Sequence, residues 1–230
     1  ESYNYVEYGG SLIDADIVRP AGQIGQDLID DASTMIGLGR MFDAKTVEII
    51  NDGSDGSAAI IRAAGGVSPL TIMTGTLESP DLLVERSVDI TTDYILEPNS
   101  NLLRLESTIE WKDVDTPVQI SDFMFTSADI AQPYQQKVGY DSTVPDTYGW
   151  SGILGHRNEI AVALLQGEDL REFTASSVLE SIFDLGPLLL GSTPTLTLTD
   201  NETYTWSRYV GVAEDMSTLT DEWYQRSGTA

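Results

Sequence analysis

The sequence predicts an all-β protein, a large antiparallel β-sandwich with one or two short helices. Residues 84–96 and 103–111 alternate apolar and polar side chains over more than eight positions each. This period of two is typical of a strand with one buried and one exposed face. Short apolar runs elsewhere are separated by Gly, Pro, Asn and Asp, which favour turns. Only residues 216–226 carry a clear helical pattern.

Length and composition favour one domain. The chain has 230 residues, which is enough for a single large β domain or two small ones. No Ser/Gly/Pro-rich linker and no low-complexity block interrupts it. We therefore expect residues 1–230 to form one β-sandwich domain.

The first third of the chain contains short elements and one hairpin. Residues 3–8 and 11–18 read as strands, whereas apolar residues at intervals of four within 24–36 predict a short helix, with a packed loop as the alternative. Residues 46–50 and 58–63 flank an Asn/Asp/Gly-rich turn, which is a strong hairpin signal.

That turn, residues 51–56, is acidic and therefore has a calcium loop as its alternative interpretation. The EF-hand pattern requires Glu at its twelfth position, where this chain has Arg62. The hairpin interpretation is favoured, and a partial calcium site stays open. A further strand is expected at residues 70–77.

Three successive antiparallel strands are predicted at the centre of the chain. Residues 84–96 and 103–111 are joined by a Pro/Asn/Ser turn, and residues 118–128 follow as the third strand. The apolar phase of this third strand slips by one residue, which predicts a β-bulge near residues 121–122.

The last third continues as sheet and ends in a helix. A long loop is expected at 132–150, and strands at 160–165 and 171–183, the latter with a helix as the alternative. Residues 195–199 and 203–212 are expected to pair as a hairpin. In all, ten to fourteen strands are expected.

The terminal helix, residues 216–226, has both a start signal and an apolar stripe. Asp215 or Ser217 can cap its first turn, and Leu219 and Trp223 lie on one face.

The net charge of −25, from 37 acidic and 12 basic residues, disfavours nucleic-acid binding and attraction to anionic membranes. The acidic residues are dispersed, which suits a saline medium, where salt screens the repulsion between them. Cation binding is the alternative explanation of the acidic composition. There is no cysteine, which fits an exported bacterial protein, and no apolar run is long enough to insert in a membrane. We expect a secreted or cell-surface location.

The best candidate ligand site is an aromatic loop region. It combines flat rings with hydrogen-bonding groups, a mixture that suits a sugar ring or a protein partner. The candidate ligand-binding residues are Tyr148, Trp150, His156, Arg157 and Glu159. The alternative is that these aromatic rings pack one open end of the sandwich.

No catalytic, metal or cofactor site is predicted. The single histidine, His156, has no Gly-x-Ser-x-Gly elbow to accompany it, and a zinc site built on several histidines is excluded by count. With 37 acidic residues, neighbouring carboxylates are expected by chance, so no glycosidase pair can be nominated.

Several segments resemble known β domains. Residues 91–108 are similar to the paired strands of galactose mutarotase-like β-supersandwich domains. Residues 9–14, 47–53 and 208–212 resemble the amino-terminal β domain of large secreted bacterial proteins that carry a PHP-type metallohydrolase domain.

The resemblance implies a supersandwich-like fold and a non-catalytic relative, because mutarotase catalysis uses histidines with a carboxylate base and this chain has one histidine. The predicted function is a non-catalytic extracellular module that binds carbohydrate or packs against a neighbouring catalytic domain. Two alternatives remain: a structural subunit of a cell-surface or filamentous assembly, which would self-assemble, and a carboxylate-dependent polysaccharide-active enzyme.

Overall fold

Sixteen strands and one helix make up the described part of the chain. A computed structural model describes residues 15–18, 24–29, 31–36, 40–69, 88–111, 116–118, 120–125, 131–133, 150–155, 161–167, 174–178, 188–192, 196–198 and 201–227. The first eight strands are β1 (Ala15–Val18), β2 (Ile24–Ile29), β3 (Asp31–Ile36), β4 (Arg40–Asn51), β5 (Ala59–Pro69), β6 (Val88–Leu96), β7 (Leu102–Trp111) and β8 (Thr116–Val118). The remaining elements are β9 (Ile120–Phe125), β10 (Ala131–Pro133), β11 (Trp150–Gly155), β12 (Ala161–Gln166), β13 (Thr174–Val178), β14 (Leu188–Ser192), β15 (Leu196–Leu198), β16 (Glu202–Ala213) and α1 (Met216–Ser227).

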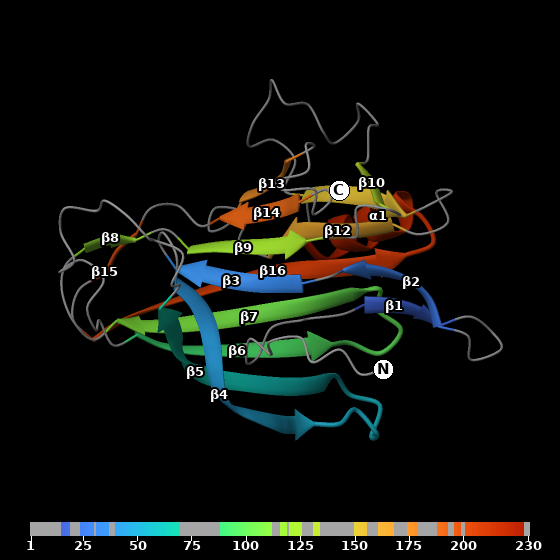
Figure 1. The fold of residues 1–230 in the computed structure, drawn as a ribbon. Coiled ribbons are helices and arrows are strands. Elements are labelled where there is room, and N and C mark those ends of the chain that lie inside the picture. Colours follow the sequence, from blue (N-terminus) through green and yellow to red (C-terminus); the bar gives the residue numbers. More distant parts are fainter. Residues whose placement is uncertain are drawn as a thin grey trace.

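Twelve of the described strands form one antiparallel sheet. Their order is β10-β11-β12-β16-β7-β6-β5-β4-β3-β9-β14-β13, and β1–β2 and β15–β8 form two small separate sheets. Strands β11 and β12, near one end of this order, lie close to β13 and β14 at the other end. The sheet therefore turns back on itself as two layers (Figure 1). The predicted all-β, sandwich-like fold with a short helix is confirmed.

The turn between the layers lies at β4. Only Arg40 and Met41 of this strand pair with β3, whereas β4 pairs with β5 from Arg40 to Asn51. A register shift between Ala44 and Thr46 leaves Lys45 as a bulge opposite Gly65, and a Cβ on Gly65 would overlap the backbone of β4. Because a bulge bends its strand, β4 can leave one layer and enter the other.

Strand β16 is buried on both faces in its middle, at residues 206–211. It pairs with β7 on one side and with β12 on the other. Trp206 and Arg208 point into the space between the layers, where Arg208 reaches Thr34 of β3. Tyr209 points to the opposite face and joins the cluster beneath α1.

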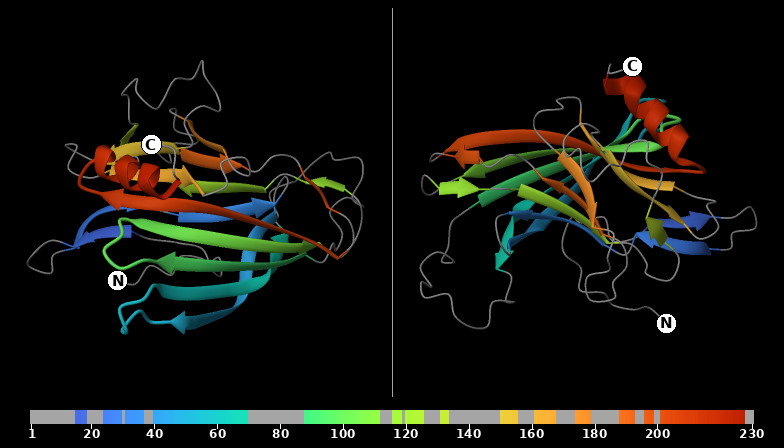
Figure 2. Two further views of the ribbon diagram at one scale, coloured as in Figure 1. Left: turned by 180° about the vertical axis from the view of Figure 1, so that it is seen from behind. Right: turned by 90° about the horizontal axis from the view of Figure 1, so that it is seen from above.

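Helix α1 closes this outer face (Figure 2). Asp215 caps it, because its carboxylate accepts a 2.8 Å hydrogen bond from the Thr218 amide. The buried stripe of Met216, Leu219 and Trp223 packs on β7, β11, β12 and β16. The helix approaches closely where the sheet carries no large side chain, since a Cβ on Gly152 would overlap Met216. The predicted terminal helix is confirmed.

The central strand pair is confirmed, but its third member is not. Strands β6 and β7 pair antiparallel from Val88↔Trp111 to Leu96↔Leu103. The neighbour of β7 on its other side is β16. Of residues 118–128, the described part forms β9, which pairs with β3 and β14, while Val118 ends β8 in a separate sheet. The predicted bulge at 121–122 is therefore wrong, because β9 runs in register with β3 and β14 through these residues.

Two other predictions are also wrong. Residues 24–36 form strands β2 and β3 instead of a helix, since β3 pairs with β9 over six residues and this tertiary pairing outweighs the local spacing. Residues 195–199 do not pair with 203–212, because β15 pairs with β8 and β16 lies between β7 and β12.

The apolar strand at 160–165 and the strand within 171–183 are confirmed as β12 and β13. Residues 3–8 and 70–77 lie outside the described residues.

Removing the indole of Trp223 should test how strongly α1 holds the sheet. This side chain is 3% exposed, and its Nε1 donates a 2.8 Å hydrogen bond to the Gln166 carbonyl. Trp223→Ala should lower the free energy of unfolding by about 3–5 kcal/mol, measured by urea denaturation. The exposed Gln225 on the same helix gives the control, and Gln225→Ala should change stability by less than about 0.5 kcal/mol. Equal effects of the two substitutions would contradict the packing described.

Candidate functional site

The predicted aromatic site is represented by one residue in the described chain. Trp150 begins β11, is 5% exposed and belongs to the cluster beneath α1. Its ring therefore packs the domain, which is the alternative that the sequence left open for these aromatic residues. Tyr148, His156, Arg157 and Glu159 lie outside the described residues, and their role in a ligand site stays a prediction.

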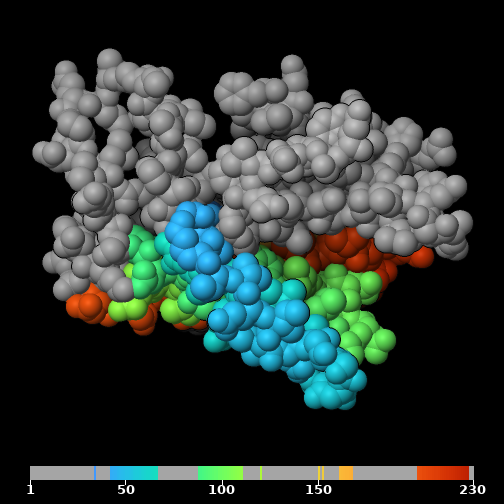
Figure 3. Space-filling model, turned by 60° about the horizontal axis from the view of Figure 1, so that its bottom comes forward, coloured from blue at the N-terminus to red at the C-terminus, as the bar shows by residue number. Residues whose placement is uncertain are grey.

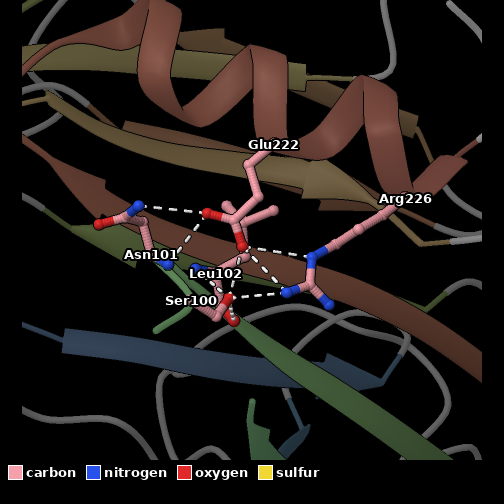
Figure 4. A network of polar contacts seen from close by, with 5 residues as sticks. All are labelled: Ser100, Asn101, Leu102, Glu222 and Arg226. Carbon is pink, nitrogen blue, oxygen red and sulfur yellow. Dashed lines mark hydrogen bonds and ion pairs between the residues drawn. The ribbon is translucent and has the colours of Figure 1, made fainter. Parts of the chain in front are cut away.

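A polar network joins α1 to the β6–β7 turn (Figure 4). The Glu222 carboxylate accepts hydrogen bonds from the Ser100 hydroxyl at 2.6 Å, the Asn101 amide at 3.0 Å and the Arg226 guanidinium at 3.0 Å. Burial opposes ionisation of Glu222, but these hydrogen bonds outweigh it and hold its pKa below the ordinary value. Because its oxygens are engaged, Glu222 is suited to holding the helix and not to proton transfer.

A second polar group lies between the layers. Arg208 is 1% exposed and donates hydrogen bonds to the Ser107 hydroxyl at 2.5 Å and the Thr34 hydroxyl at 3.1 Å. Its guanidinium also lies 5.4 Å from the ring centroid of Trp206. These contacts join β16 to β7 and β3, so the arginine links the two layers.

The acidic turn at 51–56 closes the β4–β5 hairpin, as predicted. Asp52 accepts a 2.9 Å bond from the Ser54 amide, and Asp55 accepts 3.0 Å and 2.6 Å bonds from the Ser57 amide and hydroxyl. These hydrogen bonds lower the pKa of both carboxyls. The carboxylates are thus engaged by the turn itself, and the described residues contain no group of three or more potential metal ligands.

The outer end of the same hairpin exposes an apolar surface. We define the apolar patch as Val47, Ile49, Ile61 and Leu96, which are 62%, 72%, 44% and 44% exposed. Ile49 of β4 pairs with Ile61 of β5. Ala59, also of β5, pairs with Leu96 of β6. Directly paired residues share a face, so strands β4, β5 and β6 build one surface.

The apolar patch is a continuation of the sandwich interior. From Ile61 the row runs across the sheet through Tyr94 to Leu105 and Arg208. Exposure falls along this row from 72% at Ile49 to 7% at Leu105 and 1% at Arg208. The second layer thus covers the centre of this face and leaves its β4 end open. The hairpin projects from the described surface (Figure 3).

The polar surroundings of the patch are acidic. Asp52, Asp55 and Glu97 are exposed in the two turns beside it. Of the nearby cations, Lys45 bonds to Asp43, and Arg62 forms 2.6 Å and 2.7 Å bonds with Asp93 on the opposite face. The patch and its acidic surroundings are the candidate functional site.

The sequence reading missed this site. Val47 and Ile49 alternate with Thr46 and Glu48, a pattern that by itself predicts only a strand. Alternation predicts that one face is apolar, but it does not say whether another layer covers that face.

Among the described helices, none is long and apolar enough to cross a membrane.

Comparisons with known proteins define no family. No protein-family model matches the chain, and no curated protein matches it.

Similar solved structures include the Slr1438 protein of Synechocystis sp. PCC 6803, with a TM-score of 0.48 and 9% identity over 93% of this chain and 100% of that one. They also include the GH36 α-galactosidase AgaB of Geobacillus stearothermophilus (TM-score 0.43, 11% identity, 88% of this chain and 30% of that one). A third is the galactosidase domain of the α-galactosidase–sucrose kinase AgaSK (TM-score 0.45, 11% identity, 90% of this chain and 31% of that one).

The chain spans about a third of the length of the two galactosidase chains. At TM-scores below 0.5 they define neither the family nor the activity of this chain, and the predicted association with a PHP-type domain is not shown.

Neutralising Glu222 should make the thermal stability less dependent on pH in the acidic range. Because the pKa of this carboxyl is lower in the folded chain, its contribution is complete above the ordinary glutamate value of about 4.3 and is lost as the pH falls through the folded pKa. Glu222→Gln should therefore lower the Tm at pH 7 and have a smaller effect at pH 3.

Thermal unfolding followed by circular dichroism from pH 7 to pH 3 measures this difference. Asp221→Asn, on the exposed side of the same helix, is the control. A Tm difference between wild type and Glu222→Gln that is constant over this range would contradict the role assigned to the network.

Proposed function

We propose that the chain is a non-catalytic module that docks onto a neighbouring protein domain through the apolar patch. The observation that supports the proposal is the rise in exposure along one face of the sheet, from the covered centre to the open β4 end. Apolar surface that continues a core beyond its covering layer gains free energy when a partner buries it.

The chemistry of the patch favours protein over carbohydrate. Its four members are aliphatic, and sugar rings are bound by flat aromatic faces together with hydrogen-bonding groups. Trp150, the described member of the predicted aromatic site, is buried in the cluster beneath α1. Of the two binding modes in the predicted function, contact with a neighbouring domain is therefore the better supported.

We further propose that the module acts outside the cell, next to a catalytic domain of a larger secreted protein. The support is the cysteine-free composition and the net charge of −25. A dispersed acidic surface keeps the domain soluble in a saline medium.

Substitution of the patch should weaken docking. A phage library that displays protein fragments of the source organism is selected on the wild-type chain, and the affinity of each enriched fragment is then measured. Val47→Asn with Ile49→Asn should weaken binding by about tenfold or more, since the partner would bury two polar amides in place of apolar side chains.

The control is Val212→Asn on β16, a 38% exposed apolar side chain outside the patch. Enriched fragments that bind all three proteins equally would contradict the proposal. Saccharide binding on a glycan array that is unaffected by the double substitution would show a carbohydrate-binding function in its place.

A further inference from the structure

The outer edge of β4 offers backbone groups beside the apolar patch. Within the described chain, residues 42–51 pair with β5 alone, because β3 bonds only to Arg40 and Met41. In a strand paired on one side, alternate amides and carbonyls point away from the partner strand. Such an edge can accept a further strand.

Two bulges limit where such a strand can pair regularly. Lys45 and Ile50 are the extra residues at the two register shifts of β4. The regular run between them is Thr46, Val47, Glu48 and Ile49, all of which are exposed. A strand added here would have its register set by the bulges.

The side chains of this run specify what the added strand should carry. Residues placed opposite Val47 and Ile49 would lie on the patch face, about 4.5–5.5 Å away from them at Cβ, and should be apolar. The residue opposite Glu48 would lie on the other face, where a Lys or Arg forms an opposite-charge pair. The exposed carboxylates of Asp52, Asp55 and Glu97 also favour positive charge on the added strand.

The geometry points to β-strand addition: the edge residues 46–49 of β4 bind an extended segment of a partner protein with apolar residues at alternate positions and Lys or Arg between them. This inference rests on the proposed function and adds to it the conformation and charge of the partner. A second copy of the chain fits less well, since each copy carries a net charge of −25 and would place acidic turns beside acidic turns.

A capped seven-residue peptide of alternating lysine and valine serves as the probe. Its affinity is measured by fluorescence anisotropy at low salt, and amide hydrogen exchange is followed by NMR. Binding should slow the exchange of those amides of residues 43–51 that exchange rapidly in the free protein. The same peptide N-methylated at alternate residues, made in both registers, should lose binding in at least one register, because a methyl group removes the donor needed for pairing.

Charge reversal provides the matched test. An alternating glutamate–valine peptide should bind wild type about tenfold more weakly than the lysine–valine peptide. Glu48→Lys should reduce or reverse this preference, while Glu110→Lys on β7, outside the hairpin, should leave it unchanged.

Several results would overturn the inference. Binding without slowed exchange in β4, equal binding of the two peptides, or a Glu48→Lys variant with an unchanged preference would each do so. A dimer seen by light scattering and dissociated by the lysine–valine peptide would assign the edge to a second copy instead.

Failure of this inference can be separated from failure of the proposed function. If enriched fragments need Val47 and Ile49 but do not protect β4, the patch docks proteins by its face alone and strand addition is wrong. If β4 is protected but the double substitution has no effect, docking through the apolar patch is wrong.

Discussion

The pairing of β16 with β7 is the interaction on which the rest of the fold depends. It aligns ten residue pairs between segments about a hundred positions apart in the chain. Because the middle of β16 is buried on both faces, one strand supplies Trp206 and Arg208 to the space between the layers and Tyr209 to the cluster beneath α1. Shifting its register by one residue would exchange these two sets and place the arginine beneath the helix.

The burial of Arg208 between the layers loses hydration but helps to align the two layers. A buried guanidinium loses hydration, and the loss must be offset by hydrogen bonds. Ser107 and Thr34 supply two of them from β7 and β3, and Ser107 also bonds to Thr92 of β6 at 2.8 Å. Since these hydroxyls come from both layers, the group favours one alignment of the layers, whereas apolar packing alone would tolerate several.

Local patterns predicted the elements whose pairing is local. The β6–β7 pair, the β4–β5 hairpin and α1 each contain their own turn, cap or apolar stripe, so the sequence identified them. The neighbours of β7 and β9 could not be predicted in this way, because strand order is decided by long-range packing and no residue near a strand encodes it. The same limit explains the segment at 24–36, where pairing with β9 overrides a helical spacing.

The candidate site was hidden from the sequence for a related reason. The aromatic residues around Trp150 in a polar segment predict a ligand site, yet the neighbours of Trp150 in space place it in the core. Val47 and Ile49 look like ordinary strand residues, and only the strand registers show that β3 pairs with Arg40 and Met41 alone and that no described strand lies beside them. Exposure is a property of the assembled layers, so neither side chain could be classified without them.

The open edge of β4 must avoid pairing with other copies of the chain. Exposed apolar edges promote aggregation, and proteins limit this with bulges and charged residues. Here Lys45 occupies a bulge, Ile50 marks a second one, and Glu48 lies in the run between them. Two such edges brought together antiparallel would also bring their acidic turns close to the sheet of the other copy, at a cost that salt reduces only in part. The features that oppose self-pairing are also those that would favour the basic strand proposed above, so the same few residues would act against self-association and for that partner.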